Sequence, residues 1–219
     1  MRYELIIFDL DGTIADTCKD ITEALNYCLK LRNIPIFSVQ EVKKMVGEGV
    51  RRLIEKALQS KKVSFSEELL NELIQCFISY YGEHIADFTK TYPEVEDTLK
   101  KLKPFKKAII SNKTEYLTIK TLEQLNLKHY FDFIAGSDSF PEKKPSPLPI
   151  LKVIEKFSVP KDKTLIVGDS NIDIEAGKSA GVQTVAVTYG YREKELLKDA
   201  DFIIDNFSDL IKIVGMSLG

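Results

Sequence analysis

Short runs rich in apolar residues recur along this chain and predict β-strands, and an unbroken apolar run predicts a strand that is covered on both faces. The first run occupies residues 5–8 and leads directly into Asp9. Five further segments that look like strands or strand ends lie at residues 108–111, 133–136, 164–169, 182–188 and 201–204. Segments with helical spacing separate these runs, so strand and helix alternate from about residue 90. Such alternation predicts an α/β fold with a Rossmann-like parallel sheet and helices on both of its faces.

Residues 16–86 break this alternation and show helical spacing alone. Apolar residues recur there three or four positions apart, as at Ile21, Ala24, Leu25, Cys28 and Leu29, and again at Val50, Leu53, Ile54, Ala57 and Leu58. This spacing predicts amphipathic helices that each bury one face. We therefore expect a small α-helical domain at residues 16–86, inserted after the first strand of a core domain that comprises residues 1–15 and 87–219.

The composition gives no sign of a nucleic-acid partner, a membrane span or a disulfide framework. The 219 residues carry a formal net charge of -2, which gives no reason to expect a nucleic-acid or membrane partner. No segment approaches the roughly 20 apolar residues of a membrane span. Cys18, Cys28 and Cys76 are widely spaced and form no CxxC or Cys/His cluster, so we expect buried thiols in a reducing cytoplasm rather than a disulfide or a zinc site.

Polar side chains gather where the predicted strands end. Asp9 and Asp11 follow the first strand and point to the same side of an extended chain. The second strand ends with Ser111, Asn112 and Lys113, and the fourth ends with Asp169. Asp173 follows Asp169 by four positions, a spacing that places both on one face of a helix starting there, and Lys144 lies in the loop after the third strand. Ligands of open α/β sheets collect at this edge.

These residue types suit phosphoryl transfer. Clustered carboxylates select a hard divalent cation, and we expect Mg²⁺, which also relieves their mutual repulsion. One aspartate can act as a nucleophile while a second carboxylic acid protonates the leaving group. A serine hydroxyl, backbone N–H groups near Asn112 and a lysine can hold the phosphoryl oxygens. Each of these short motifs, taken alone, also fits an ordinary turn or a surface charge. The argument for a site is that all of them occur together, each at or after the end of a predicted strand.

Four motifs together resemble the haloacid dehalogenase superfamily with a type 1 helical cap. They are Asp9-x-Asp11-Gly-Thr, the strand-ending Ser111, Lys144 and Asp169-x-x-x-Asp173. The resemblance implies that Asp9 is the nucleophile, that Asp11 is the general acid and base, and that Ser111, Asn112 and Lys144 bind phosphate. It also implies that Mg²⁺ is held by Asp9, the backbone carbonyl of Asp11 and Asp169, with Asp173 in support, and that the helical insertion is a cap over the site.

The leaving group is harder to predict. Asp11 favours transfer of the phosphoryl group to water, and residues 45–58 resemble the cap loop of phosphoglycolate phosphatases. Gly47 and Gly49 either end a helix or bring backbone amides to a small anion, with Arg51 or Arg52 nearby.

The leading hypothesis is a cytoplasmic Mg²⁺-dependent phosphatase for a small phosphorylated metabolite, with 2-phosphoglycolate as the first choice. A phosphosugar mutase, a nucleotidase or pyrophosphatase, and a noncatalytic phosphate-binding module are the alternatives. The sequence gives no indication of the oligomeric state, and we expect structural or surface roles for His84 and His129.

Overall fold

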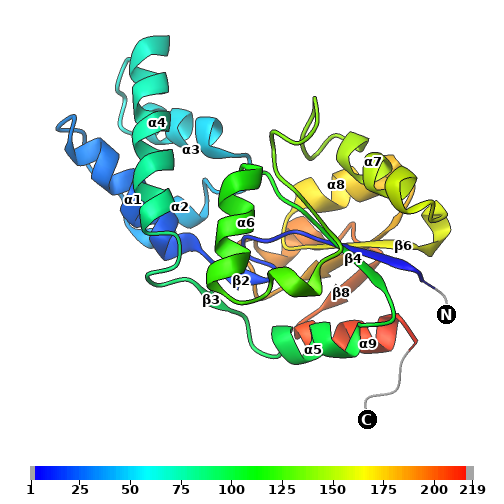
Figure 1. Ribbon diagram of the computed structural model, residues 1–219. Helices are drawn as coiled ribbons and strands as arrows, with labels where there is room; N and C mark the ends of the chain where they lie inside the picture. Colours follow the sequence, from blue (N-terminus) through cyan, green and yellow to red (C-terminus); the bar gives the residue numbers. More distant parts are fainter. Residues whose placement is uncertain (1–2, 216–219) are drawn as a thin grey trace.

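In the computed structural model, which describes residues 3–215, a six-stranded sheet forms the centre of the molecule (Figure 1). Its strands are ordered β5-β4-β1-β6-β7-β8, and every neighbouring pair is parallel. They are β1 (Leu5–Phe8), β4 (Lys106–Ile110), β5 (Phe133–Ala135), β6 (Thr164–Gly168), β7 (Gln183–Val187) and β8 (Phe202–Ile204). The predicted strands and their parallel arrangement are confirmed.

Helices cover both faces of the sheet, as the alternation predicts. Ile6 and Phe8 of β1 pack into a core with α5 (Val95–Lys101), α6 (Glu115–Gln124) and α9 (Leu210–Ile213). Leu5 and Ile7 face the opposite core, against α7 (Leu148–Phe157) and α8 (Asn171–Ala180). Figure 1 shows α5 and α9 on one side of the sheet and α7 and α8 on the other. Short 3₁₀ helices complete this part of the chain at Lys128–Tyr130, Lys161–Lys163, Lys194–Leu197 and Phe207–Asp209.

Strand β1 lies in the middle of the sheet, and this position fixes where its acidic end emerges. Leu5 is in register with Lys106 of β4 on one side and with Thr164 of β6 on the other. All four residues of β1 are buried. The Asp9 N–H continues the ladder and donates to Val167 O at 2.9 Å. The Asp9 side chain therefore stands at the carboxyl edge of the sheet with little backbone freedom.

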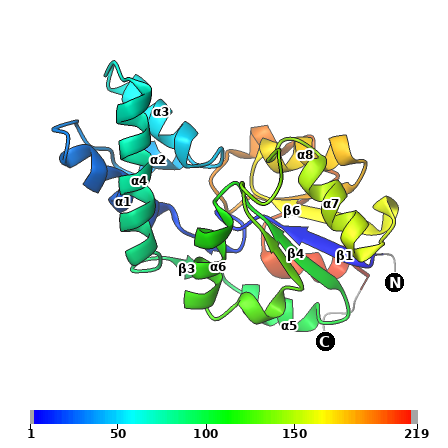
Figure 2. The same cartoon turned by 45° about the horizontal axis from the view of Figure 1, so that its top comes forward.

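The helical insertion forms a group of its own beside the sheet (Figure 2). The chain leaves through β2 (Ala15–Asp16) and returns through β3 (Lys90–Thr91), which pair antiparallel. Between them lie α1 (Cys18–Lys30), α2 (Val39–Lys43), α3 (Val50–Ser60) and α4 (Glu67–Glu83), which share one apolar core. The inserted helical cap is confirmed, whereas the domain limits at residues 16 and 86 stay a prediction. Within the described residues, no helix is both long and apolar enough to cross a membrane.

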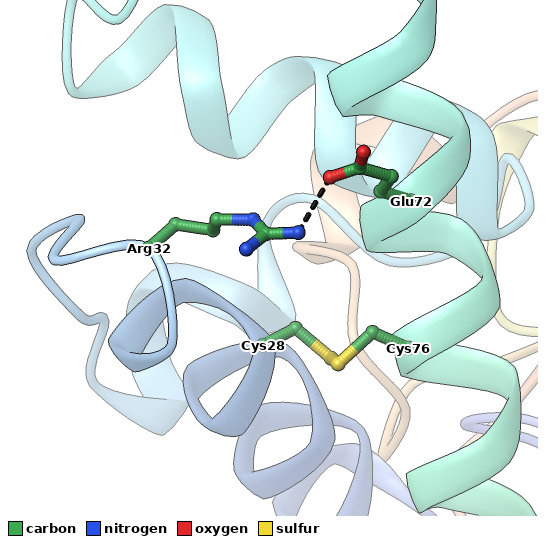
Figure 3. Close-up of a disulfide and its surroundings, with 4 residues drawn as sticks. All are labelled: Cys28, Arg32, Glu72 and Cys76. Atoms are coloured by element: carbon green, nitrogen blue, oxygen red, sulfur yellow. Dashed lines mark hydrogen bonds and ion pairs between the residues drawn. A yellow bond between two sulfur atoms is a disulfide. The ribbon is translucent and has the colours of Figure 1, made fainter.

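A disulfide joins Cys28 of α1 to Cys76 of α4, so our prediction of free thiols was wrong for these two residues (Figure 3). Their Cα atoms lie 5.9 Å apart, although 48 positions separate them in sequence. The two helices pack side by side, and this tertiary contact leaves no local sequence pattern. Arg32 and Glu72 form an exposed ion pair between the same two segments. Cys18 is free and buried, as expected.

Candidate active site

A sharp turn after β1 carries Asp9 and Asp11 to the edge of the sheet. Gly12 makes this turn with a φ of 88°, a conformation that residues with a side chain rarely adopt. Its N–H donates to Ala15 O at 2.9 Å. A Cβ at this position would lie 2.3 Å from Asp169 Oδ2, so the lack of a side chain also lets Asp169 approach Asp9.

Three buried carboxylates meet at this edge. Asp9, Asp169 and Asp173 each offer an oxygen, and these oxygens all lie within 4.8 Å of one another. Asp169 directly follows β6, whereas Asp173 lies in the first turn of α8, where its Oδ2 accepts the Ser170 N–H and Oγ–H. The two aspartates therefore converge. They do not share one face of a helix, as their spacing predicted, because α8 begins only at Asn171.

Lys144 joins two members of this cluster. Its Nζ lies 2.9 Å from Asp9 Oδ1 and 2.6 Å from Asp173 Oδ1, and its side chain is only 2% exposed. Burial alone would lower the pKa of Lys144, but the carboxylates of Asp173 and Asp9 raise it above its ordinary value. The lysine therefore remains a fixed positive charge beside Asp9.

One ammonium group does not balance the acidic cluster. Burial raises the pKa of Asp9 to about 7 despite the opposing charge of Lys144, and repulsion from Asp173 and Asp11 adds to the rise. Burial, Asp173 and Asp9 raise the pKa of Asp169 well above its ordinary value, against the Tyr191 N–H that donates to its Oδ2 at 2.6 Å. The three buried carboxylates thus carry more negative charge than Lys144 neutralises. Converging oxygen ligands of this kind fit a hard divalent cation such as Mg²⁺.

Ser111 and Asn112 directly follow β4 and line the same pocket as Asp9, at the strand end where the sequence placed them. The Ser111 Oγ accepts the Lys113 N–H at 3.2 Å. The Asn112 side-chain amide donates to Gly47 O and to Lys144 O, each at 2.9 Å. Asn112 thus ties the loop that carries Lys144 to the cap, while phosphate binding by Ser111, Asn112 and Lys144 stays a prediction.

Asp11 has partners that the sequence analysis did not single out. Its Oδ1 lies 2.6 Å from Lys113 Nζ and accepts the Thr17 hydroxyl at 2.6 Å. Lys113 Nζ also donates to the hydroxyl of Tyr81, on α4, at 2.9 Å. The sequence placed Lys113 at this strand end, directly after Ser111 and Asn112, but gave it no role. Tyr81 could not be predicted, because its helix reaches the site only through tertiary packing.

Two pockets flank Asp9 beneath the cap. The first is lined on the core side by Asp9, Asp11, Ser111, Asn112, Lys113, Thr114 and Leu117. On the cap side it is lined by Ile21, Val46, Gly47, Gly49, Val50, Leu53, Phe77 and Tyr81. The second pocket contains Lys144, Asp169 and Asp173, and Val46 and Gly47 reach it too. The loop between α2 and α3 therefore covers both sides of the acidic cluster.

Gly47 and Gly49 give this loop its tight course. Both have positive φ, at 118° and 88°. A Cβ on Gly49 would lie 3.0 Å from Asn112 O, so the glycine permits close approach to the core. Arg51 and Arg52 stay outside, about half exposed and paired with glutamates of the cap. The interpretation of these glycines as a tight loop at the site is supported, and the two arginines are surface residues.

Comparison with known proteins agrees with this geometry. The family model described as haloacid dehalogenase-like hydrolase matches residues 6–187. A phosphoglycolate phosphatase of Aquifex aeolicus is 45% identical over 212 residues, which cover 96% of each chain. A phosphoglycolate phosphatase of Neisseria gonorrhoeae is 37% identical over 90% of this chain and 85% of its own.

A solved structure resembles the whole chain. The crystal structure of a predicted phosphoglycolate phosphatase from Haemophilus somnus superposes with a TM-score of 0.91 and 32% identity. It covers 98% of this chain, and this chain covers 99% of it. With the family match over most of the sequence and the parallel sheet beneath a helical cap, the chain belongs to the haloacid dehalogenase-like hydrolases.

Proposed function

We propose that this hydrolase is a Mg²⁺-dependent phosphatase that hydrolyses 2-phosphoglycolate through an aspartyl-phosphate intermediate. The observation that carries the proposal is the convergence of Asp9, Asp169 and Asp173 around the buried Lys144. The relatives named phosphoglycolate phosphatase support the choice of substrate.

Mg²⁺ would be held by the carboxylates of Asp9 and Asp169 and by the backbone carbonyl of Asp11. Bound there, it supplies positive charge that offsets the charge on the phosphoryl oxygens. Asp173 supports this arrangement because its two oxygens are already held by Lys144 and by Ser170. Lys144 also contacts Asp9, so the same network fixes the orientation of this proposed ligand before a substrate enters.

The protein's own groups account for the two steps of the reaction. The Asp9 carboxylate attacks phosphorus, the bond from phosphorus to the ester oxygen breaks, and the Asp11 carboxylic acid gives its proton to that oxygen. Asp11, now ionised, then takes a proton from the water that attacks the aspartyl phosphate. A phosphoryl group on Asp9 would lie beside Lys144 Nζ, with Ser111 Oγ and the backbone near Asn112 on its other side.

The wall of the first pocket favours a small leaving group. On the cap side it presents mainly the apolar side chains of Ile21, Val46, Val50, Leu53 and Phe77. A sugar or nucleoside would bury hydroxyl groups there without partners, at about 1–3 kcal/mol for each unsatisfied group. This supports a short phosphomonoester over the phosphosugar of a mutase or the nucleoside of a nucleotidase.

Phosphate release from purified protein tests the proposal. We expect hydrolysis of 2-phosphoglycolate with Mg²⁺, loss of activity with EDTA, and net release of inorganic phosphate, which a mutase would not give. Asp9→Asn should lower kcat by roughly 10³-fold or more because it removes the nucleophile. Asp162→Asn, an exposed aspartate far from the site, is the matched control. Full activity of freshly prepared Asp9→Asn would rule out Asp9 as the nucleophile.

A further inference from the structure

Lys113 is the cationic residue among those that line the first pocket. Its side chain is 5% exposed and lies where the end of β4 meets helix α4 of the cap. Its Nζ contacts Asp11 Oδ1 from the core at 2.6 Å and Tyr81 OH from the cap at 2.9 Å. The amine therefore bridges the core and the cap at the edge of the pocket.

The other cations around the cleft are already occupied or face solvent. Lys144 Nζ lies between Asp9 and Asp173. Lys143 Nζ donates to Glu48 O at 2.6 Å, and Arg192 donates to carbonyl groups at the end of α2 and in the loop that follows it. An ammonium group has three N–H donors, and Asp11 and Tyr81 use two of those of Lys113. Lys113 therefore has a donor for a second anionic group of the substrate.

The position of Lys113 relative to Asp11 limits where that second anionic group lies. In the proposed reaction, Asp11 contacts the ester oxygen of the leaving group. Lys113 Nζ donates a hydrogen bond to Asp11, so it lies close to the ester oxygen as well. In 2-phosphoglycolate a single methylene separates the ester oxygen from the carboxylate. A carboxylate that near the ester oxygen reaches Lys113, whereas an uncharged alkyl group contacts only the apolar wall.

We propose that Lys113, held between Asp11 and Tyr81, binds the carboxylate of the substrate and selects short phosphorylated carboxylic acids over uncharged phosphate esters. This inference rests on the proposed function and assigns specificity to a residue of the core rather than to an arginine of the cap. Tyr81 is the positioning residue, because its hydroxyl holds the amine at the cap side of the pocket.

The test compares two esters of similar size, 2-phosphoglycolate and n-propyl phosphate, in Lys113→Met. We expect KM for 2-phosphoglycolate to rise roughly 30- to 100-fold, which corresponds to the loss of a charge-assisted hydrogen bond. KM for n-propyl phosphate should change less than about three-fold, since it has no carboxylate to lose. Lys113→Arg should recover part of the preference. Lys152→Met, an exposed lysine on α7, is the matched control.

The outcomes separate the possible roles. An equal fall of kcat on both esters overturns the inference and assigns Lys113 to holding Asp11. If the wild type hydrolyses n-propyl phosphate but not 2-phosphoglycolate, the proposed function fails. The acid is then tested as a competitive inhibitor, and an inhibition constant that Lys113→Met leaves unchanged overturns the inference as well. Should the methionine variant not fold, as judged by thermal melting, Lys113→Gln gives the same comparison.

Discussion

Asp169 owes its position to the absence of two side chains. A Cβ on Gly12 would lie 2.3 Å from Asp169 Oδ2, and a Cβ on Gly190 would lie 2.3 Å from Asp169 Cβ and 2.6 Å from Gly12 O. The Tyr191 N–H then fixes the carboxylate by donating to Oδ2. The acidic cluster therefore requires glycine at position 190, because any side chain there would displace Asp169.

Gly190→Ala should therefore weaken the site. We expect Mg²⁺ affinity and kcat/KM to fall at least about ten-fold, since a one-ångström displacement of a reacting group is costly. A Mg²⁺ titration followed by calorimetry and by phosphate release measures both. Gly82→Ala, in helix α4, is the matched control, because a Cβ there would lie an ordinary 3.7 Å from its nearest atoms, in the Tyr116 side chain. It should leave activity intact and stabilise the fold by about 0.5–1 kcal/mol. Equal behaviour of the two variants would contradict this account of Gly190.

Cys18 should be inert in the folded protein. Burial raises the pKa of its thiol to about 12, and the negative charge of Asp16 adds to the rise. The thiol is the protonated form at every pH below that value, and only the thiolate reacts with alkylating reagents. At pH 8, iodoacetamide should leave the native chain unlabelled, as read by mass spectrometry. In denaturant without a reductant it should label Cys18 alone. Rapid labelling of native Cys18 would show that the residue is accessible.

At the level of elements, features that depend on a single segment were predictable and features that join distant segments were not. The unbroken apolar run at residues 5–8 predicts β1, because a strand that is covered on both faces is apolar throughout. The convergence of Asp9 and Asp169 could be predicted because parallel strands end at a common edge, and Lys144 lies in the loop that follows another strand of the same sheet. The Cys28–Cys76 disulfide and the contact between Lys113 and Tyr81 depend on how α1, α4 and β4 pack. A sequence without tertiary structure does not show that packing.

The disulfide should stabilise the pairing of α1 with α4. Loop-closure entropy for a separation of 48 residues gives about 4 kcal/mol, and measured values are typically about 2–4 kcal/mol. The exposed pair of Arg32 and Glu72 between the same segments adds little. We expect a reductant to lower the midpoint of thermal unfolding of the wild type. It should not affect the double variant Cys28→Ser, Cys76→Ser. An unchanged wild-type midpoint after reduction would contradict a stabilising role.

For the whole molecule, the relation of cap to core depends on a few side chains that reach across the cleft. Arg192, which follows β7, donates to Lys43 O at 2.9 Å and also to Val46 O. Asn112 donates to Gly47 O at 2.9 Å, and Lys143 donates to Glu48 O at 2.6 Å. All four acceptors are backbone carbonyls at the end of α2 or in the loop that follows it. Core side chains thus hold this loop over the acidic cluster through its backbone.

Removing the two contacts of Arg192 should shift the cap away from the site. In Arg192→Met we expect KM for 2-phosphoglycolate to rise several-fold and protease cleavage in the loop after α2 to accelerate, because two carbonyl groups lose their donor. Kinetics and limited proteolysis measure the two effects on one preparation. Arg51→Met removes a cap arginine that pairs only within the cap, so neither readout should change. A rise in KM without faster cleavage would instead place the effect of Arg192 in the electrostatics of Asp169, which its charge also reaches. Faster cleavage together with the rise in KM would show that the loop must be held down for the substrate to bind.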